Sequence, residues 1–148
     1  MKRIILSGGG TGGQIYPAVA VAEALKRRFG EQVELLFVGA EGRMEMEKIP
    51  ALGYRIVGLP IAGLQRRMDW HNLAVPFKVL RSLRQARRTI RTFGADVVVG
   101  FGGYASAPVL WAAQRMGVPT VIQEQNSYAG VTNKILARGA RRICTAYE

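Results

Sequence analysis

Short, wholly apolar runs alternate with amphipathic helical segments along this chain, and the alternation constrains its fold more than any other feature. Runs such as Ile4-Ile5-Leu6 and Val97-Val98-Val99 are apolar at every position instead of at every second one. Strands of this kind are buried on both faces, as in a parallel sheet that carries helices on each side. The pattern predicts an α/β fold with a Rossmann-like, doubly wound parallel sheet.

The periodicity also gives the expected elements. Strands are expected at residues 3–7, 33–38, 54–58, 96–100, 119–123 and 141–145. Helices are expected at residues 15–29, 43–52, 73–93, 105–116 and 129–138. A chain of 148 residues with 49% hydrophobic content has room for one domain with a sizeable core. We therefore expect a single domain over residues 1–148.

A glycine-rich run, Gly8-Gly9-Gly10-Thr11-Gly12-Gly13-Gln14, lies between the first expected strand and the first expected helix. Glycine lets the backbone approach a ligand closely, and the N–H groups at a helix start favour negative charge. The run therefore predicts a loop that binds a diphosphate.

Other families also place glycines at this position. The pattern Gly-x-Gly-x-x-Gly from Gly8 matches the dinucleotide fingerprint, which further requires an acidic residue closing the second strand. That strand ends at Gly39 and Glu41 lies beyond it, so a Rossmann dinucleotide-binding domain stays only as an alternative. A nucleoside-triphosphate P-loop is excluded because Gln14 stands where that motif needs lysine. A run that serves only a tight turn is a further alternative.

Two more loops of unusual composition follow expected strands. Residues 101–108 read Phe-Gly-Gly-Tyr-Ala-Ser-Ala-Pro, and residues 123–127 read Gln-Glu-Gln-Asn-Ser. The carboxyl ends of parallel strands meet at one edge of the sheet, where ligands bind in this fold class. We expect the three loops to form one site, in which amides, a carboxylate and a hydroxyl suit sugar hydroxyls and a phosphate.

In combination, the three loops resemble those of the MurG family of glycosyltransferases. The resemblance rests on residues 8–13 with Tyr16-Pro17-Ala18, on residues 102–106 with Pro108, and on Glu124-Gln125-Asn126 with Gly130 and Thr132-Asn133-Lys134. It implies the GT-B fold, in which two Rossmann-like domains face each other across a cleft. The chain would be the N-terminal, acceptor-side domain over residues 1–148, and the C-terminal nucleotide-sugar domain would be absent from it.

The resemblance also implies a reaction of peptidoglycan synthesis at the cytoplasmic face of the cell membrane, where the protein would be peripheral. Members of the family transfer N-acetylglucosamine (GlcNAc) from UDP-GlcNAc to lipid I, the undecaprenyl-diphosphate-linked muramyl pentapeptide, and form lipid II with inversion. No metal or other cofactor is expected. The implied partners are UDP-GlcNAc, lipid I and an anionic membrane surface, with room for other cell-wall synthesis proteins. The isolated domain is expected to bind without turnover, and a non-catalytic acceptor- or membrane-binding module is the alternative.

The resemblance assigns roles to individual loop residues. UDP-GlcNAc would contact Thr11, Gly12, Gly13 and Asn126. The acceptor diphosphate and sugar would contact Gly10, Gly102, Gly103, Tyr104 and Ser106.

Gln14 departs from the family pattern, in which a histidine usually follows the Gly-Thr-Gly-Gly run. A side-chain amide takes no proton near neutral pH, so Gln14 is excluded as a general base. Three interpretations stay open: the base lies elsewhere, with Glu124 as the candidate; the residue at position 14 only orients the acceptor; or the site is weakened. The Glu124 carboxylate could equally bind neighbouring backbone N–H groups.

The expected helix at 73–93 carries a mixed basic and apolar face. On a helical wheel, the stripe expected to pack on the sheet consists of Val79, Leu83, Ala86, Ile90 and Phe93. The neighbouring face consists of Leu73, Phe77, Leu80, Arg81, Arg84, Arg88 and Arg91. Apolar side chains among arginines suit an anionic membrane surface. A solvated basic face, with its apolar residues packed under residues 59–72, is the alternative.

The remaining composition narrows the class of partner. The formal net charge of +11 would permit nucleic-acid binding, but no zinc-finger spacing or RNA-recognition pattern accompanies it, so no nucleic-acid partner is expected. The sole cysteine, Cys144, excludes an internal disulfide, and no metal site is expected around the sole histidine, His71. The sequence predicts neither a signal peptide nor a membrane span.

Overall fold

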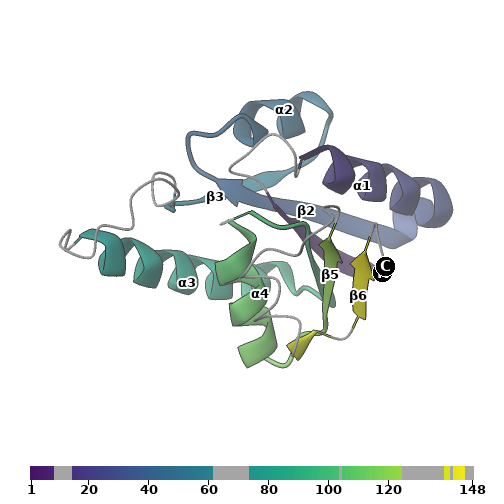
Figure 1. The fold of residues 1–148 in the computed structure, drawn as a ribbon. Coiled ribbons are helices and arrows are strands. Elements are labelled where there is room, and N and C mark those ends of the chain that lie inside the picture. The colour runs from purple at the N-terminus through teal and green to yellow at the C-terminus, as the bar shows by residue number, and fades with distance from the viewer. Residues whose placement is uncertain (9–14, 62–73, 104, 125–138, 141, 146–148) are drawn as a thin grey trace.

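The computed structural model describes residues 1–8, 15–61, 74–103, 105–124, 139–140 and 142–145. The strands are β1 (Lys2–Ser7), β2 (Val33–Ala40), β3 (Ile56–Leu59), β4 (Val97–Gly100), β5 (Thr120–Glu124) and β6 (Arg142–Thr145). The helices are α1 (Ile15–Phe29), α2 (Glu45–Ala51), α3 (Ala74–Phe93) and α4 (Ser106–Arg115), with a short 3₁₀ turn, η2 (Gly30–Gln32), after α1. Strands and helices alternate as the sequence predicts (Figure 1). The helix expected at 129–138 and His71 lie outside the described residues.

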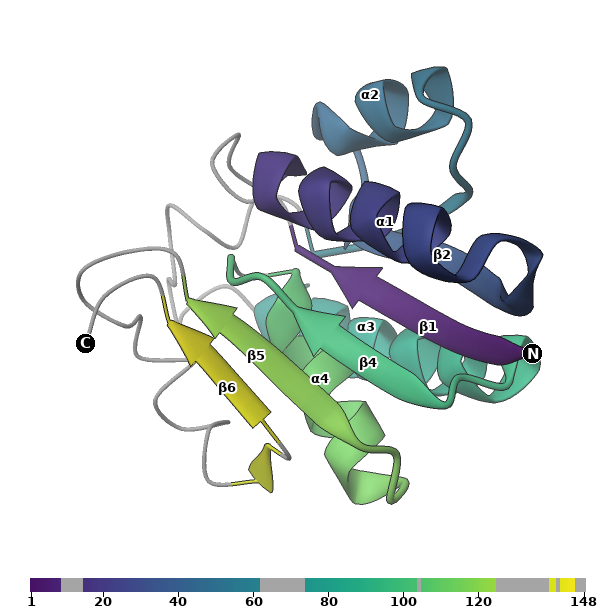
Figure 2. The ribbon, with the colours of Figure 1, turned by 90° about the vertical axis from the view of Figure 1, so that its right-hand side faces the viewer.

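The strands form one parallel sheet in the order β3-β2-β1-β4-β5-β6. From β1 the chain runs outward through β2 to the edge strand β3, then returns through α3 to β4 on the other side of β1. Figure 2 shows α1 and α2 on one side of the sheet and α3 and α4 on the other. The predicted doubly wound, Rossmann-like sheet is confirmed, and its winding reverses between β1 and β4.

The core has two parts because the sheet is buried on both faces. Successive strand residues point to opposite faces, and the neighbours Ile5 and Leu6 enter separate clusters, each with no exposed surface. Ile5 packs with Ile90 of α3 and Leu110 of α4, whereas Leu6 packs with Ala18 of α1. The wholly apolar runs are therefore strands buried on both faces, as the sequence predicted.

The face of α3 that packs on the sheet agrees with the helical wheel except at its beginning. Ala86, Ile90 and Phe93 are buried and Leu83 is half-buried, but Val79 is 37% exposed, so its predicted burial is wrong. The first turns of α3 project beyond the sheet (Figure 1), so the sheet covers less of the helix there. Periodicity finds the inward face of a helix but not where the supporting sheet stops.

Candidate functional site

The starts of the three predicted ligand loops lie at one edge of the sheet. These loops follow β1, β4 and β5, which are neighbours in the sheet. The Phe101 N–H donates a hydrogen bond of 2.8 Å to the Ser7 carbonyl, which ties the start of the second loop to the end of β1. Residues 8 and 101 thus leave the sheet side by side at the point where its winding reverses, the usual ligand position in such sheets.

The start of the glycine-rich run, at the end of β1, is hydrogen-bonded to β2. Ser7 is fully buried, and its hydroxyl donates to the Val38 carbonyl at 3.2 Å. The Gly8 N–H donates to the same carbonyl at 3.3 Å. After the run, α1 starts at Ile15, which is buried. The run therefore connects the end of β1 to the N-terminus of α1, the kind of connection that favours anions.

The residues of the run that were assigned to ligands lie outside the described residues. These are Gly10, Thr11, Gly12, Gly13 and Gln14. The same holds for Tyr104 of the second loop and Asn126 of the third. Their predicted contacts stay predictions.

The second loop makes a tight turn that needs its glycines. Gly102 and Gly103 have φ angles of +94° and +79°, in the left-handed region where a side chain is strained. The Ser106 N–H and hydroxyl both donate to the Gly103 carbonyl, at 3.3 and 3.0 Å, and Ser106 is fully buried. Ser106, which the resemblance assigns to the acceptor, thus fixes the turn at the start of α4 through hydrogen bonds within the loop, and its contact with the acceptor stays a prediction.

The third loop begins at Glu124, the last residue of β5. Its backbone pairs in register with Thr145 of β6. Glu124 therefore leaves the sheet at the same edge as Gly8 and Phe101, one strand further from β1.

A buried carboxylate, Glu45, lies near this edge of the sheet and was not predicted from the sequence. Glu45 is 2% exposed, and its Oε1 accepts a hydrogen bond of 3.0 Å from the Ala40 N–H at the end of β2. A Cβ on Gly39 would lie 2.6 Å from the Glu45 Cγ, so the glycine makes room for this side chain. One signal was available: Glu45 and the buried Ile49 are four residues apart and share a face of α2.

The mixed face of α3 is accessible where the structure describes it. Phe77 and Leu80 are 66% and 46% exposed, and Arg81, Arg84 and Arg88 are exposed on the same helix. Leu73 lies outside the described residues. Trp111 of α4, which was not among the predicted residues, is half-exposed, and the centroid of its ring lies 5.0 Å from the Arg115 guanidinium carbon. The sequence feature that could have identified this contact is an aromatic residue four positions before an arginine on an expected helix.

The described part of the chain contains neither a membrane-spanning helix nor a cluster of metal ligands. No described helix is long and apolar enough to cross a membrane. No group of three or more His, Cys, Asp or Glu residues among the described ones could hold a metal ion.

A doubly wound sheet with two glycine-rich loops at its switch point defines the class of Rossmann-like α/β domains. Residues 4–145 match the Glycosyltransferase family 28 N-terminal domain, and the chain belongs to this family.

Similar sequences within the family agree with the resemblance that the loops suggested. The chain is 61% identical over 145 residues to the UDP-N-acetylglucosamine--N-acetylmuramyl-(pentapeptide) pyrophosphoryl-undecaprenol N-acetylglucosamine transferase of Porphyromonas gingivalis, covering 98% of the chain. The transferase of the same name from Bacteroides fragilis is 60% identical over 146 residues, or 99% of the chain. The chain spans 38% of the length of each of these relatives.

Solved structures agree with this fold. The crystal structure of Acinetobacter baumannii MurG superimposes with a TM-score of 0.88 and 33% identity, covering the whole chain and 42% of that protein. A UDP-N-acetylglucosamine 2-epimerase from Rickettsia bellii has a TM-score of 0.68 at 16% identity, covers the whole chain and 39% of that protein, and shows the shared fold alone. The predicted resemblance to MurG and the predicted fold class are both confirmed.

Proposed function

We propose that the chain is the acceptor-side domain of a transferase that moves GlcNAc from UDP-GlcNAc to lipid I and so forms lipid II. The observation that carries the proposal is the 61% identity to the Porphyromonas gingivalis transferase over 98% of the chain. The name of that relative states the sugar transferred and a pyrophosphoryl-undecaprenol acceptor. The order of the three loops along neighbouring strands supports the same function.

The acceptor diphosphate, in this proposal, lies against the turn at the start of α4. The left-handed glycines Gly102 and Gly103 keep side chains away from the backbone there. The N-terminus of the ten-residue helix α4 follows directly and favours negative charge. Gly10 and Tyr104 complete this subsite, and Ser106 contributes by fixing the turn through its bond to the Gly103 carbonyl.

The donor is proposed to contact Thr11, Gly12, Gly13 and Asn126. Transfer forms a bond from the acceptor hydroxyl oxygen to the anomeric carbon and breaks the bond to UDP. The hydroxyl proton must leave, and the departing diphosphate gains negative charge, which N–H groups of the glycine-rich run would stabilise. Glu124 is the candidate base and Gln14 an orienting group, since an amide cannot take the proton.

The two-domain organisation and the location are also proposals. The nucleotide-sugar domain would correspond to the part of the relatives that this chain does not match, so the chain alone would bind acceptor without transfer. The exposed Phe77 and Leu80, with Arg81, Arg84 and Arg88, would hold the domain peripherally at the anionic cytoplasmic face of the membrane. Lipid I, which is anchored in that membrane, would then come within reach of the loops.

Acceptor binding tests this function directly. The chain is titrated with lipid I in detergent micelles, with undecaprenyl monophosphate and NAD as separate ligands. Lipid I is expected to bind more tightly than the monophosphate, which lacks the second phosphate and the sugar. Binding of NAD without binding of lipid I would contradict the proposal and favour the dinucleotide-binding alternative.

A further inference from the structure

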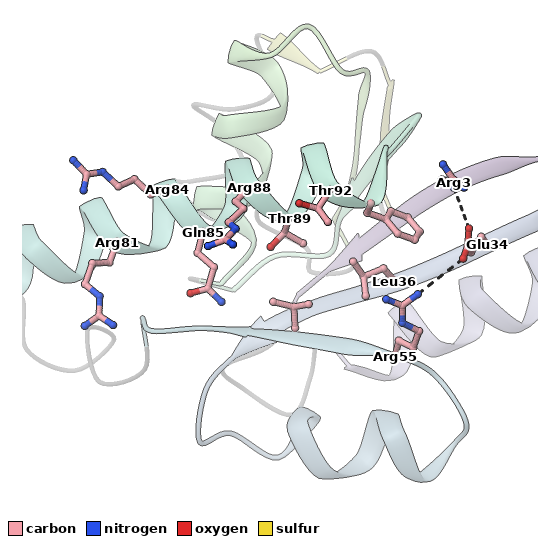
Figure 3. Close-up of a pocket in the computed structure, with 12 residues that line it drawn as sticks. Arg3, Glu34, Leu36, Arg55, Arg81, Arg84, Gln85, Arg88, Thr89 and Thr92 are labelled. Atoms are coloured by element: carbon pink, nitrogen blue, oxygen red, sulfur yellow. Dashed lines mark hydrogen bonds and ion pairs between the residues drawn. The ribbon is translucent and has the colours of Figure 1, made fainter.

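A groove of about 720 Å³ runs between α3 and the part of the sheet formed by β1, β2 and β3 (Figure 3). We call it the α3 groove. It extends to the first residues of β1 and β2, whereas the predicted ligand loops leave from the opposite ends of the strands. The transferase function proposed above makes no use of most of the side chains that line it.

The sheet wall of the α3 groove carries a short row of charges. Arg3 of β1 and Glu34 of β2 are neighbours in register, and the Arg3 Nε lies 3.0 Å from the Glu34 Oε2. Arg55, just before β3, places its Nη1 3.9 Å from the other oxygen of Glu34, and its side chain is 71% exposed. One carboxylate thus lies between two guanidinium groups, and positive charge remains in excess on this wall.

The helix wall adds cations that have no carboxylate partner among the described residues. Arg81 and Arg88 are exposed and line the groove, and no ion pair of either is found in the described part of the chain. They are two helical turns apart, or about 10 Å along the axis. Gln85 donates a hydrogen bond of 3.0 Å to the Gly58 carbonyl, which attaches this wall to the edge strand β3. Figure 3 shows Arg81 and Gln85 directed from α3 toward β3.

An apolar floor lies between the charged ends of the groove. Leu36 and Phe93 are buried and Val57 is half-buried there. Arginines stand toward both ends, so a lipid tail along this floor would meet charged groups at either end. An extended polypeptide fits better, because its side chains alternate and those on one side repeat about every 6.8 Å. Apolar side chains can then face the floor while acidic ones reach the arginines.

We propose that the α3 groove binds an extended acidic segment of a partner polypeptide, with apolar residues between its carboxylates. The proposal goes beyond the transferase function and needs neither substrate. Charge complementarity supports it: five arginines line the groove against the single carboxylate of Glu34. Nucleic acid fits less well, because the aromatic ring in the lining, Phe93, is buried and cannot stack on a base.

The test uses the full chain and a fluorescein-labelled peptide of alternating glutamate and valine, followed by fluorescence anisotropy. A peptide of alternating lysine and valine controls for charge, and a peptide with the same glutamates and valines in separate blocks controls for spacing. Arg55→Gln and Arg88→Gln remove groove charges, whereas Arg87→Gln removes an exposed charge of α3 that does not line the groove. Each groove variant is expected to weaken binding roughly three- to fivefold and Arg87→Gln less than roughly 1.5-fold.

Three results would overturn the proposal. Equal losses for all three variants would mean diffuse attraction to a basic chain. No preference for the alternating glutamate–valine peptide over the block peptide would remove the role of the apolar floor. Binding of phosphatidylglycerol vesicles that depends on Arg55, without peptide binding, would assign the groove to lipid. Arg88 belongs to both the groove and the face of α3 proposed to meet the membrane, whereas Arg55 lines the groove alone. Failure of peptide binding together with an unchanged response of vesicle binding to Arg55→Gln would therefore leave the membrane proposal standing. Thermal unfolding of each variant shows that the fold is retained.

Discussion

Position 14 is where the resemblance implies a departure from the family pattern, with Gln14 in place of a histidine. If Glu124 is the base, or if residue 14 only orients the acceptor, an amide and an imidazole serve about equally well. In the enzyme completed with a nucleotide-sugar domain, we expect Gln14→His to change kcat by less than about threefold. Gln14→Ala should lower kcat about tenfold, the effect of one lost hydrogen bond of about 1.4 kcal/mol.

Steady-state kinetics with lipid I and UDP-GlcNAc measure both variants. A gain of about a hundredfold or more for Gln14→His, the range that general-base catalysis contributes, would show instead that glutamine weakens the site.

Gly103 offers a second test at single-residue scale, with a matched control. Gly103 and Gly117 have φ angles of +79° and +77°, and a Cβ on Gly117 would meet nothing within 4 Å. Either glycine replaced by alanine should lower the free energy of unfolding by about 1–2 kcal/mol, because both need the left-handed conformation. Only Gly103→Ala should weaken lipid I binding. Thermal unfolding and acceptor titration separate the two effects, and an equal loss of affinity in both variants would argue against an acceptor role for the turn.

Individual residues also show what the sequence could not reveal. Gly102 and Gly103 stand out in the sequence as a glycine-rich loop before a helix start, but their positive φ angles are apparent only in the structure. Glu45 was missed because its burial depends on the space that Gly39 leaves on β2. It also depends on the hydrogen bond that the Glu45 carboxylate accepts from the Ala40 N–H. The contact of Ser106 with the acceptor, which the resemblance implies, stays a prediction, and its bond to the Gly103 carbonyl depends on backbone geometry that composition does not specify.

Among the helices, α3 carries the feature that is proposed to meet the membrane. Phe77 and Leu80 are 66% and 46% exposed, and inserting such side chains into the lipid interface is favourable. Replacing both with glutamine should lower binding to phosphatidylglycerol vesicles by about a hundredfold, or about tenfold for each residue. Phe29, which is 44% exposed at the end of α1, provides the matched control.

Vesicle co-sedimentation measures this loss. If Phe29→Gln lowers binding as much as the two α3 substitutions do, the interaction is not localised on α3. If none of the three matters while added salt abolishes binding, arginines alone account for it.

Elements were predicted well where one periodicity governs a whole segment. The expected bounds of the first helix, 15–29, agree with α1, because a glycine-rich run precedes it and Gly30 follows it with a positive φ. The predicted burial of Val79 is wrong, because burial near the start of α3 depends on how far the sheet extends beneath the helix, which periodicity does not reveal. The α3 groove was also beyond prediction, since its walls come from residues as distant in sequence as Arg3 and Arg88.

For the molecule as a whole, the sequence predicted the class of sheet but not its strand order. Alternating elements indicate parallel strands, yet many orders satisfy that pattern. The order β3-β2-β1-β4-β5-β6 places β1 beside β4 and so brings the starts of the first two glycine-rich loops, Gly8 and Phe101, side by side. The three loops were expected to form one site because of their composition. The reversal of the winding between β1 and β4 is the physical reason why the first two of them start side by side.

The measurement that tests the central claim most directly is transfer of labelled GlcNAc from UDP-GlcNAc to lipid I. The chain is assayed alone and joined to the remaining part of the Porphyromonas gingivalis transferase, with Gln14 and with Gln14→His; the complete relative is the positive control. The proposal predicts no transfer by the chain alone and lipid II formation by the joined protein. Transfer by the chain alone would contradict its assignment as the acceptor-side half. A folded joined protein that forms no lipid II with either residue at position 14 would contradict the transferase function itself.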